Sequence, residues 1–281
     1  MSAVGKTPPS VSVIMGVLNG EGLVTGAVES LVDQTFPPSE IVIVDDGSTD
    51  GTGDELDRLD KRFPGLLVVA KQPNTGVGAA LNRAIGLASG DYLAVADCDD
   101  RYLPHRLEET VRLLEEHDAD IAGGQVNMVL GRWLKFGRSS FPVEPEAMAE
   151  RNERGFAPVP HTTMMLRRSS VERFGEYRNV MRAEDFELMR RWVANGARVV
   201  VSDKVLATHV LRREHLSVEQ QFRWMVNTAY ARTAAEFGDD DVPDFMSWFR
   251  SAPLKAAKRE ARRRVVRLSV RGILATTGLR R

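Results

Sequence analysis

The stretch YLAVADCDDRYLPHRLE, residues 92–108, places three aspartates directly after an apolar run: Asp97, Asp99 and Asp100. A second apolar run, EIVIVDD, ends in Asp45 and Asp46. Carboxylates this close repel one another, and burying them unpaired costs several kcal/mol. A divalent cation relieves that repulsion, and hard oxygen ligands suit Mg²⁺ or Mn²⁺. Because Mg²⁺ held by one or two carboxylates takes its other oxygens from phosphates and water, the pattern indicates a clamp for a metal–diphosphate.

Strands and helices that alternate along the first half of the chain must position these acids. Four short apolar runs are expected strands: 11–17, 41–44, 66–70 and 92–96. Helical spacing follows at 23–32, within 74–90, and at 103–114, where Pro104 suits a first turn. This alternation predicts an α/β fold with a Rossmann-like, doubly wound, mostly parallel sheet. Ligands of such sheets bind beyond the carboxyl ends of the strands, where both acid clusters lie.

The second half of the chain has a less regular pattern. Its expected strands are 121–130, 162–166, and one or two within 198–210. Residues 137–160 are rich in Pro, Gly and charge, and they predict a mobile loop region. The expected helices are 183–195, closed by Gly196, and an amphipathic one at 217–237, followed by a linker at 238–244.

Composition limits the class of protein. A length of 281 residues suits one large domain with an appendage. The single cysteine, Cys98, excludes an intrachain disulfide and a cysteine-rich zinc site. The sequence has no apolar run of about 18 residues and no segment typical of a signal peptide, so we expect a cytoplasmic protein.

The net charge of −1 hides an asymmetry. Residues 251–281 carry ten Lys or Arg and one acid, a net charge of +9, whereas the remaining residues carry 28 basic and 38 acidic groups, a net charge of −10. A basic tail on an acidic body suits an anionic partner: a lipid surface, a nucleic acid or an acidic protein. Because the tail lacks interleaved aromatic residues, we expect no nucleic-acid binding. Its apolar stripe favours a helix that rests on an anionic membrane surface, at the inner face of the cell membrane. The alternative is a solvated helix that packs this stripe on the catalytic domain.

Six segments in order resemble the family 2 glycosyltransferases, which are nucleotide-sugar-dependent enzymes of the GT-A fold: VSVIMGVLNG, EIVIVDDGSTDGT, NTGVGAALNRAIGLASGDYLAVADCDD, HTTMMLRRSSVERFGEY, AEDFELMRRW and LRREHLS. The resemblance runs from about residue 11 to 217. It implies a catalytic domain over 1–240, with a nucleotide-binding half at 11–100 and an acceptor half at 101–240. Residues 241–281 are then a linker and a basic helical tail.

The resemblance also implies an activity: transfer of a sugar, with inversion, from a nucleoside-diphosphate sugar to a hydroxyl acceptor. The acceptor would be a saccharide or lipid-linked, as in the synthesis of cell-envelope polysaccharide or glycolipid. The cofactor would be Mn²⁺ or Mg²⁺. Self-association into a homo-oligomer stays open.

Roles at matching positions follow from the same resemblance. The donor nucleotide and its diphosphate would be bound by Val17, Asn19, Asp45, Asp46, Asn74, Asp97, Arg212 and Ser217. Asp97 and Asp99 match a DxD motif, with Asp99 the expected metal ligand, Asp97 nearer the ribose and metal, and His209 a candidate to complete the metal shell. Departures from the family pattern occur at Gly16, Leu18 and Leu81, and the late arginine can be Arg212 or Arg213.

The acceptor side needs a carboxylate that removes the proton from the incoming hydroxyl. Asp185 matches the family's base in the "ED" pair, at the start of an expected helix. An acid in a helix first turn is also favoured by the helix dipole alone, an interpretation that suits Glu184. We expect Glu184 and His161 on the acceptor side. Ser217 opens a capping box, SVEQ, and can cap and bind phosphate at once.

Three other interpretations remain open at this stage. Asp99 or Asp100 can simply cap the helix that begins near Pro104. The chain can be a non-catalytic module that binds nucleotide sugars. It can also be an NAD-dependent oxidoreductase, because GEGLVTG follows a strand, although its G-x-G-x-x-x-G spacing is one residue too long.

Overall fold

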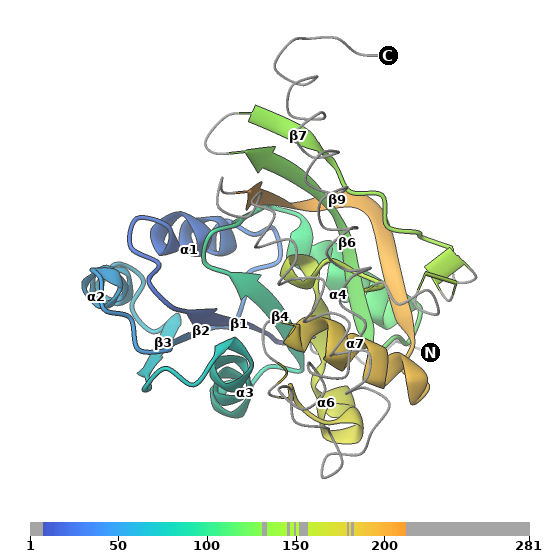
Figure 1. Cartoon of the computed structure of the whole chain (residues 1–281), viewed down its shortest axis with the longest axis horizontal. Coiled ribbons are helices and arrows are strands. Elements are labelled where there is room, and N and C mark those ends of the chain that lie inside the picture. Colours follow the sequence, from blue (N-terminus) through green and yellow to red (C-terminus); the bar gives the residue numbers. More distant parts are fainter. Residues whose placement is uncertain are drawn as a thin grey trace, which may run out of the picture.

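The computed structural model describes residues 8–130, 134–144, 147–148, 150–151, 157–178, 180 and 183–211. In this part of the chain, one nine-stranded sheet has the order β3-β2-β1-β4-β8-β6-β9-β5, and β7 pairs with β6 at its side (Figure 1). Several predictions fall outside the described residues: the helix 217–237, the linker 238–244, the tail 251–281, and the site residues Arg212, Arg213 and Ser217.

The first four strands form the parallel half of the sheet: β1 (Val11–Val17), β2 (Glu40–Asp45), β3 (Leu67–Lys71) and β4 (Tyr92–Asp97). Strand β1 pairs in parallel with both β2 and β4, and β2 pairs in parallel with β3. The apolar side chains of β1, β2 and β4 are buried on both faces, which is why these runs are continuously apolar, whereas β3, at the end of the sheet, leaves Val68 exposed. All four predicted strands are confirmed, and none of their ends differs from the prediction by more than one residue.

Helices cover both faces of the sheet. Helices α1 (Val24–Val32), α2 (Thr52–Arg62) and α4 (Arg106–Glu116) share one apolar core with β1, β2 and β4. Helices α3 (Val77–Leu87) and α7 (Glu184–Ala194) share a second core on the opposite face. A short helix, α6 (Arg168–Phe174), adds Val171 to this second core. The predicted doubly wound α/β sheet is therefore confirmed.

The second half of the chain extends this sheet with strands of both directions. Strand β8 (Met165–Arg167) pairs antiparallel with β4 and with β6 (Ile121–Leu130), and β6 pairs in parallel with β9 (Val199–Leu211). The short β5 (Arg101–Tyr102) pairs antiparallel with β9, and β7 (Leu134–Arg138) with β6. Strands β1 to β4, β6 and β9 share one direction, so the described sheet is mostly parallel, as predicted.

Several predicted bounds are wrong. Helix α4 begins at Arg106 after the cap residue His105, whose side chain makes no capping bond, so Pro104 precedes the helix and neither Asp99 nor Asp100 caps it. The Pro104 carbonyl instead accepts from the Thr35 N–H at 2.8 Å, a tertiary contact. The expected strand 162–166 is a 3₁₀ turn, His161–Thr163, followed by β8, because the Thr163 N–H bonds back to the Pro160 carbonyl.

The region 137–160 is also less irregular than predicted. Residues 137 and 138 belong to β7, and the backbone is helical at 147–148 and 150–151. The segment 198–210, left as one or two strands, is the single strand β9, whose pairing with β6 is interrupted by register shifts near Gln125. Such irregularities add local twist and allow one long strand to follow the curved edge of the sheet.

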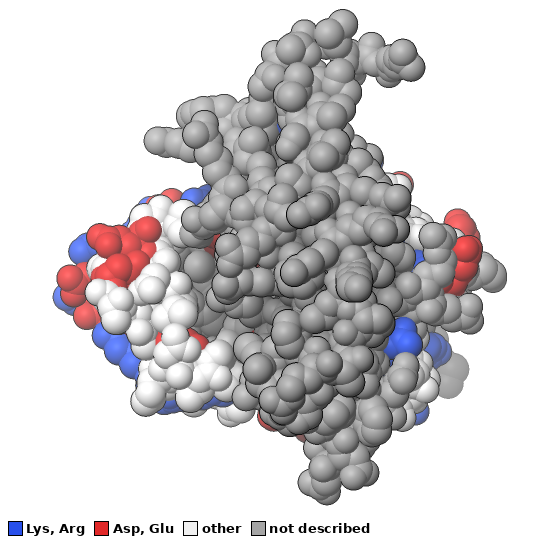
Figure 2. Space-filling view, in the orientation of Figure 1, with Lys and Arg blue, Asp and Glu red and all other residues white. Residues whose placement is uncertain are grey.

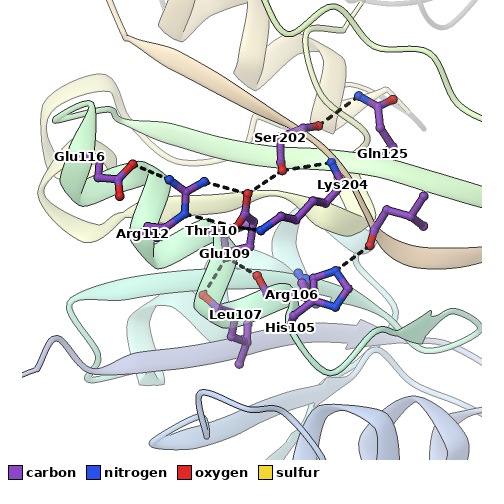
Figure 3. Close-up of polar contacts among 11 residues, drawn as sticks. His105, Arg106, Leu107, Glu109, Thr110, Arg112, Glu116, Gln125, Ser202 and Lys204 are labelled. Carbon is purple, nitrogen blue, oxygen red and sulfur yellow. Dashed lines mark hydrogen bonds and ion pairs between the residues drawn. The ribbon is translucent and has the colours of Figure 1, made fainter.

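A polar contact network fastens α4 to β9 (Figure 3). The Glu109 carboxylate accepts from Ser202 Oγ at 2.7 Å, from Lys204 Nζ at 2.8 Å and from Arg112 Nη2 at 2.9 Å. Nearby, His105 Nε2 lies 3.0 Å from the Val205 carbonyl oxygen. Because β9 continues from here to His209, these contacts hold in place the strand that brings His209 to the carboxyl edge of the sheet.

Charged side chains of both signs gather over α2, at the left of the space-filling view (Figure 2). The exposed positions of α2 are all charged: Asp54, Asp57, Arg58, Asp60, Lys61 and Arg62. This mixed face suits a helix that borders water on one side and the core on the other. Among the described residues, none of the helices combines the length and the apolar character needed to cross a bilayer.

Candidate functional site

The register of the parallel strands brings three predicted site residues to one edge of the sheet. Val17 of β1 pairs with Asp45 of β2, and the preceding residue, Gly16, pairs with Asp97 of β4. The carboxyl ends of β2, β1 and β4 therefore lie side by side. At Gly16 an added Cβ would lie 3.2 Å from Ala80 Cβ, so this small residue lets α3 approach the strand end closely. This edge is where α/β sheets of this kind bind their ligands.

Asp45 and Asp46 organise the loops around this edge. The Asp46 carboxylate accepts from the backbone N–H groups of Thr75 and Gly76, both at 2.9 Å, and from Gln72 Nε2 at 2.8 Å. The Asp45 carboxylate accepts from the Ser48 N–H at 2.9 Å. Both acids are nearly fully buried. Asp46 therefore fixes the turn that precedes α3, and Asp45 fixes the loop that follows β2.

Asn19 and Asn74 lie on the loops that surround Asp45 and Asp46. The Asn19 Oδ1 accepts from the Thr49 N–H and its own N–H donates to Ser48 Oγ, both at 2.9 Å, while its backbone is left-handed, with φ 53°. Asn74 lies so close to Gly47 that an added Cβ there would be 2.8 Å from the Asn74 nitrogen. Five of the predicted nucleotide-binding residues, Val17, Asn19, Asp45, Asp46 and Asn74, thus lie on neighbouring strand ends and loops, and the Val17 side chain is buried.

The acid turn after β4 meets the end of β9. Asp100 is fully buried, and both of its carboxylate oxygens lie 3.0 Å from His209 Nδ1. The Val210 N–H donates to Asp100 Oδ1 at 3.1 Å. Asp100 was not expected to contact His209, yet its carboxylate holds Nδ1 of this imidazole and so orients the ring. Asp97 and Asp99 are partly exposed in the same turn.

The electrostatics of the acid turn reflect crowding of like charge. Burial raises the pKa of Asp97 to about 6, with His161 opposing this rise and Asp100 and Asp99 reinforcing it. Burial alone would lower the pKa of His209, but the hydrogen bond to Asp100 and the charges of the turn raise it to about 9. The turn therefore carries a surplus of negative charge that a cation can offset.

A second set of contacts connects this turn with Tyr177. His161 Nδ1 lies 3.8 Å from Asp97 Oδ1, and its Nε2 lies 3.0 Å from the Tyr177 hydroxyl. Burial, followed by the charges of Asp185, Asp97 and Glu184, raises the pKa of Tyr177 well above its ordinary value. His161 therefore joins Asp97 to a tyrosine that is also subject to the negative charge of the α7 acids.

Helix α7 begins where it was predicted, with Glu184 and Asp185 in its first turn. Glu184 is nearly buried, and its Cγ would lie 3.1 Å from a Cβ added to Gly78, so α7 packs closely against the start of α3. Asn82 of α3 fixes Tyr177 through two bonds, to its N–H at 2.9 Å and its carbonyl at 2.8 Å. The α7 acids are thus held at fixed distance from the nucleotide-side loops.

The glycine loop GEGLVTG does not present open N–H groups to a dinucleotide. The Gly20 N–H donates to Thr52 Oγ1 and the Gly22 N–H to Glu55 Oε2, both at 2.8 Å. A Cβ on Gly26 would clash with the Arg101 guanidinium at 2.2 Å. These glycines serve packing against α2 and Arg101, which argues against the NAD-dependent alternative.

The described residues contain no group of three or more His, Cys, Asp or Glu side chains placed to hold a metal ion by themselves. The donor set still suits Mn²⁺ or Mg²⁺, because these ions accept one or two carboxylates and complete their shell with phosphate and water oxygens. The partly exposed Asp97 and Asp99, in a turn with surplus negative charge, are residues of this kind. The residues present therefore fit a metal that arrives with a diphosphate.

The family model for "Glycosyl transferase family 2" matches residues 12–175, which contain β1 to β4, β8 and the acid turn. The chain belongs to glycosyl transferase family 2. A relative named EpsE, from Bacillus subtilis (strain 168), is 33% identical over 200 residues, which are 68% of this chain and 69% of EpsE. The succinoglycan biosynthesis protein ExoU of Rhizobium meliloti is 28% identical over 221 residues, 75% of this chain and 64% of ExoU.

Solved structures agree with this family in fold. TarS of S. aureus, in complex with UDP-GlcNAc, matches with a TM-score of 0.60 at 23% identity, over 82% of this chain and 68% of that one. The mannosyltransferase PcManGT from Pyrobaculum calidifontis, in complex with GDP-Man and Mn²⁺, matches with a TM-score of 0.62 at 18% identity, over 97% and 75%. The GT-A fold predicted from the sequence is thereby confirmed.

The structure brings together most of the residues singled out in the sequence. Val17, Asn19, Asp45, Asp46 and Asn74 form the loop cluster, and Asp97, Asp99, His161 and His209 surround the acid turn. Four residues with site contacts carried no assigned role in the sequence: Asn82, Tyr102, Arg106 and Tyr177. Tyr102 and Arg106 lie in the stretch that contains the acid turn, and Asn82 and Tyr177 lie in segments that carry the family resemblance, but nothing in these segments indicated their partners.

Proposed function

We propose that this family 2 glycosyltransferase moves a sugar from a nucleoside-diphosphate sugar to a hydroxyl of a cell-envelope saccharide or lipid-linked acceptor, with inversion at the anomeric carbon. The observation that carries this proposal is the set of contacts from Asp97 through His161 to Tyr177, a residue whose pKa is raised by burial and by the charges of Asp185, Asp97 and Glu184. These contacts support one site that holds both the donor-side acids and a candidate base. The structures of TarS with UDP or UDP-GlcNAc and of PcManGT with GDP-Man support a nucleotide-sugar donor.

On the donor side, we assign the nucleotide to the loop cluster of Val17, Asn19, Asp45, Asp46 and Asn74. Its diphosphate would reach the acid turn, where Asp97 and Asp99 would hold Mn²⁺ or Mg²⁺ and His209 would face the same ion through Nε2. The ion would neutralise charge on the departing nucleoside diphosphate. Asp100 orients His209, and Asp46 holds the turn before α3 in a fixed shape. Arg212 and Ser217, outside the described residues, are proposed diphosphate ligands by resemblance.

On the acceptor side, we assign the general base to Asp185. Its carboxylate would take the proton of the acceptor hydroxyl as the oxygen attacks the anomeric carbon from the face opposite the leaving diphosphate. Attack from that face inverts the configuration. Glu184 packs against α3, and His161 bonds to Tyr177, so both fix the position of the acceptor side.

The relatives indicate which acceptors to test. They include ExoU, named for succinoglycan biosynthesis, and a poly(ribitol-phosphate) beta-glucosyltransferase of Bacillus spizizenii, 34% identical over 125 residues, 43% of this chain and 20% of that one. We propose an extended saccharide or polyol-phosphate acceptor, presented at a membrane. The domain division at residue 240 and the binding of the +9 tail, residues 251–281, to anionic lipid belong to the same proposal.

The deciding experiment is a screen of UDP-, GDP- and dTDP-sugars for Mn²⁺-dependent release of the nucleoside diphosphate by the full chain. We expect one donor to be hydrolysed slowly without acceptor and faster with a saccharide acceptor. Binding of a nucleotide sugar with no turnover under any condition would favour the non-catalytic module. No binding of any donor would overturn the proposal.

A further inference from the structure

One edge of β4 loses its strand neighbour just before the acid turn. Strand β8 pairs with β4 only at Tyr92, Leu93 and Ala94, and one further bond runs from the Val95 N–H to the Met164 carbonyl at 2.9 Å. From the Val95 carbonyl to Asp97, the main-chain groups on this side pair with no strand of the described part of the chain. Buried main-chain groups need partners, and without them the end of β4 would be poorly fixed.

Two side chains of the following segment take the place of the missing strand. The Asp97 N–H donates to the Tyr102 hydroxyl at 2.6 Å, and this hydroxyl donates to the Asp97 carbonyl at 3.0 Å. Arg106 Nη2 donates to the Val95 carbonyl. The Val95 carbonyl and the N–H and carbonyl of Asp97 thus receive their hydrogen bonds from one phenol and one guanidinium instead of from a neighbouring strand.

The Tyr102–Arg106 pair is itself rigid and buried. Tyr102 is 4% exposed and Arg106 is 0% exposed, and the Arg106 guanidinium carbon lies 4.3 Å from the centre of the Tyr102 ring. The Tyr102 N–H donates to Ser30 Oγ at 3.1 Å, and Tyr102 pairs with Ala207 of β9, two residues before His209. The Tyr102 hydroxyl also lies 3.3 Å from Thr162 Oγ1, next to His161.

A guanidinium buried this deeply needs a reason to be retained. Arg106 Nε and Nη1 have no hydrogen-bond partner among the described residues, which makes burial of this charge costly. A well-packed apolar residue would avoid that cost. What Arg106 supplies, and an apolar residue could not, is the bond to Val95, the stack on Tyr102 and a positive charge behind Asp97 and Asp100.

We propose that Tyr102 and Arg106 are positioning residues for the transfer reaction, which set the Asp97 main chain so that its carboxylate meets the donor. This inference rests on the proposed function. Neither side chain needs to touch the substrate. The pair instead connects three parts of the site, namely the end of β4, the end of β9 and the turn that carries His161, and keeps their relative positions when donor binds.

The test compares Tyr102→Phe with Tyr92→Phe. Tyr92 is a matched control, because it is 2% exposed, lies at the other end of β4, stacks with Arg167 at 5.4 Å and bonds through its hydroxyl to Glu115. The measurements are affinity for UDP and GDP with excess Mn²⁺, kcat/KM with the donor found by screening, urea unfolding, and hydrogen exchange of the Asp97 amide.

We expect Tyr102→Phe to lower kcat/KM about tenfold to a hundredfold, the scale of two lost hydrogen bonds, and to speed exchange of the Asp97 amide at least tenfold. Tyr92→Phe should leave both values near those of the parent while changing unfolding by a similar amount. Parent-like kcat/KM and amide protection in Tyr102→Phe would overturn the proposal, as would equal losses in both variants. If Tyr102→Phe does not fold, Arg106→Lys, which keeps the charge but not the planar stack, decides by the same measurements.

Failure of the proposed function gives a different result. In that case the parent protein itself neither binds UDP or GDP with Mn²⁺ nor turns over a nucleotide sugar. Exchange of the Asp97 amide would still report whether the Tyr102–Arg106 pair fixes the end of β4.

Discussion

Replacing Glu109 by Gln should destabilise the protein in a way that depends on pH. Glu109 is 5% exposed and accepts hydrogen bonds from Ser202, Lys204 and Arg112 across the α4–β9 contact (Figure 3). Burial alone would raise the pKa of Glu109, but the bonds from Arg112, Lys204 and Ser202 outweigh it and lower the pKa to about 2, from 4.5. The carboxylate is therefore strongly preferred in the folded state.

The magnitude follows from the shift. Each unit of pKa difference between the folded and unfolded chain corresponds to roughly 1.4 kcal/mol, so the ionised carboxylate contributes at most about 3 kcal/mol to the free energy of unfolding at neutral pH. The side chains of Arg112 and Lys204 are 44% and 55% exposed, so solvent screening reduces this contribution. We expect Glu109→Gln to lose about 2 kcal/mol at pH 7.

The sign of the pH dependence is fixed by the lowered pKa. The contribution is fully present above the unfolded pKa of 4.5 and is lost as pH falls toward the folded pKa of about 2. Urea unfolding at pH 7, 4.5 and 3 should therefore show a difference in the free energy of unfolding between the parent and Glu109→Gln. This difference should be nearly the same at pH 7 and 4.5 and smaller at pH 3.

The matched control is Glu116→Gln, since Glu116 bonds to the same Arg112 but its side chain is 53% exposed. Glu116→Gln should lower the free energy of unfolding by less than about 0.5 kcal/mol. The reasoning would be refuted if Glu109→Gln lost as little stability at pH 7 as Glu116→Gln, or if its loss of stability did not become smaller in acid.

Three further predictions concern the proposed reaction. Asp99→Asn should weaken Mn²⁺ binding and cut turnover by roughly two orders of magnitude, and full activity of the parent in EDTA would contradict it. Asp185→Asn should abolish turnover while nucleotide affinity stays close to that of the parent, because the lost interaction belongs to the transition state. NMR of the parent's product should show an inverted anomeric configuration, and a retained configuration would exclude the mechanism. Deleting 251–281 should end co-sedimentation with anionic liposomes without loss of nucleotide binding, and a truncated chain that still sediments would exclude the tail as the membrane contact.

The parallel half of the sheet could be predicted from local pattern. Apolar β-branched runs must be covered on both faces, and turn residues with helical spacing between them leave few other arrangements. The same pattern places acids such as Asp45 and Asp97 at the ends of strands, so the edge of the sheet where the site is proposed could be predicted from the sequence. The ordered motifs added the family, which the comparison confirmed.

Other features depended on the tertiary structure. The sequence suggested Pro104 for a first turn, but its carbonyl bonds to Thr35, far along the chain, and the helix begins later. Residues 162–166 have strand-forming types, yet the bond from Thr163 to Pro160 makes their first part a 3₁₀ turn. Where local preferences are nearly balanced, such contacts decide the backbone.

The partners of the site residues were decided only by the fold. The sequence by itself determined that Asp97, Asp99 and Asp100 cluster, and that Asp185 opens a helix. It did not determine that Asp100 would take His209 or that Tyr102 would complete the edge of β4. Periodicity records whether a side chain is buried, because burial repeats with the period of the element. It carries no information on which distant group supplies the hydrogen bond, since that depends on how segments a hundred residues apart meet in the packed sheet.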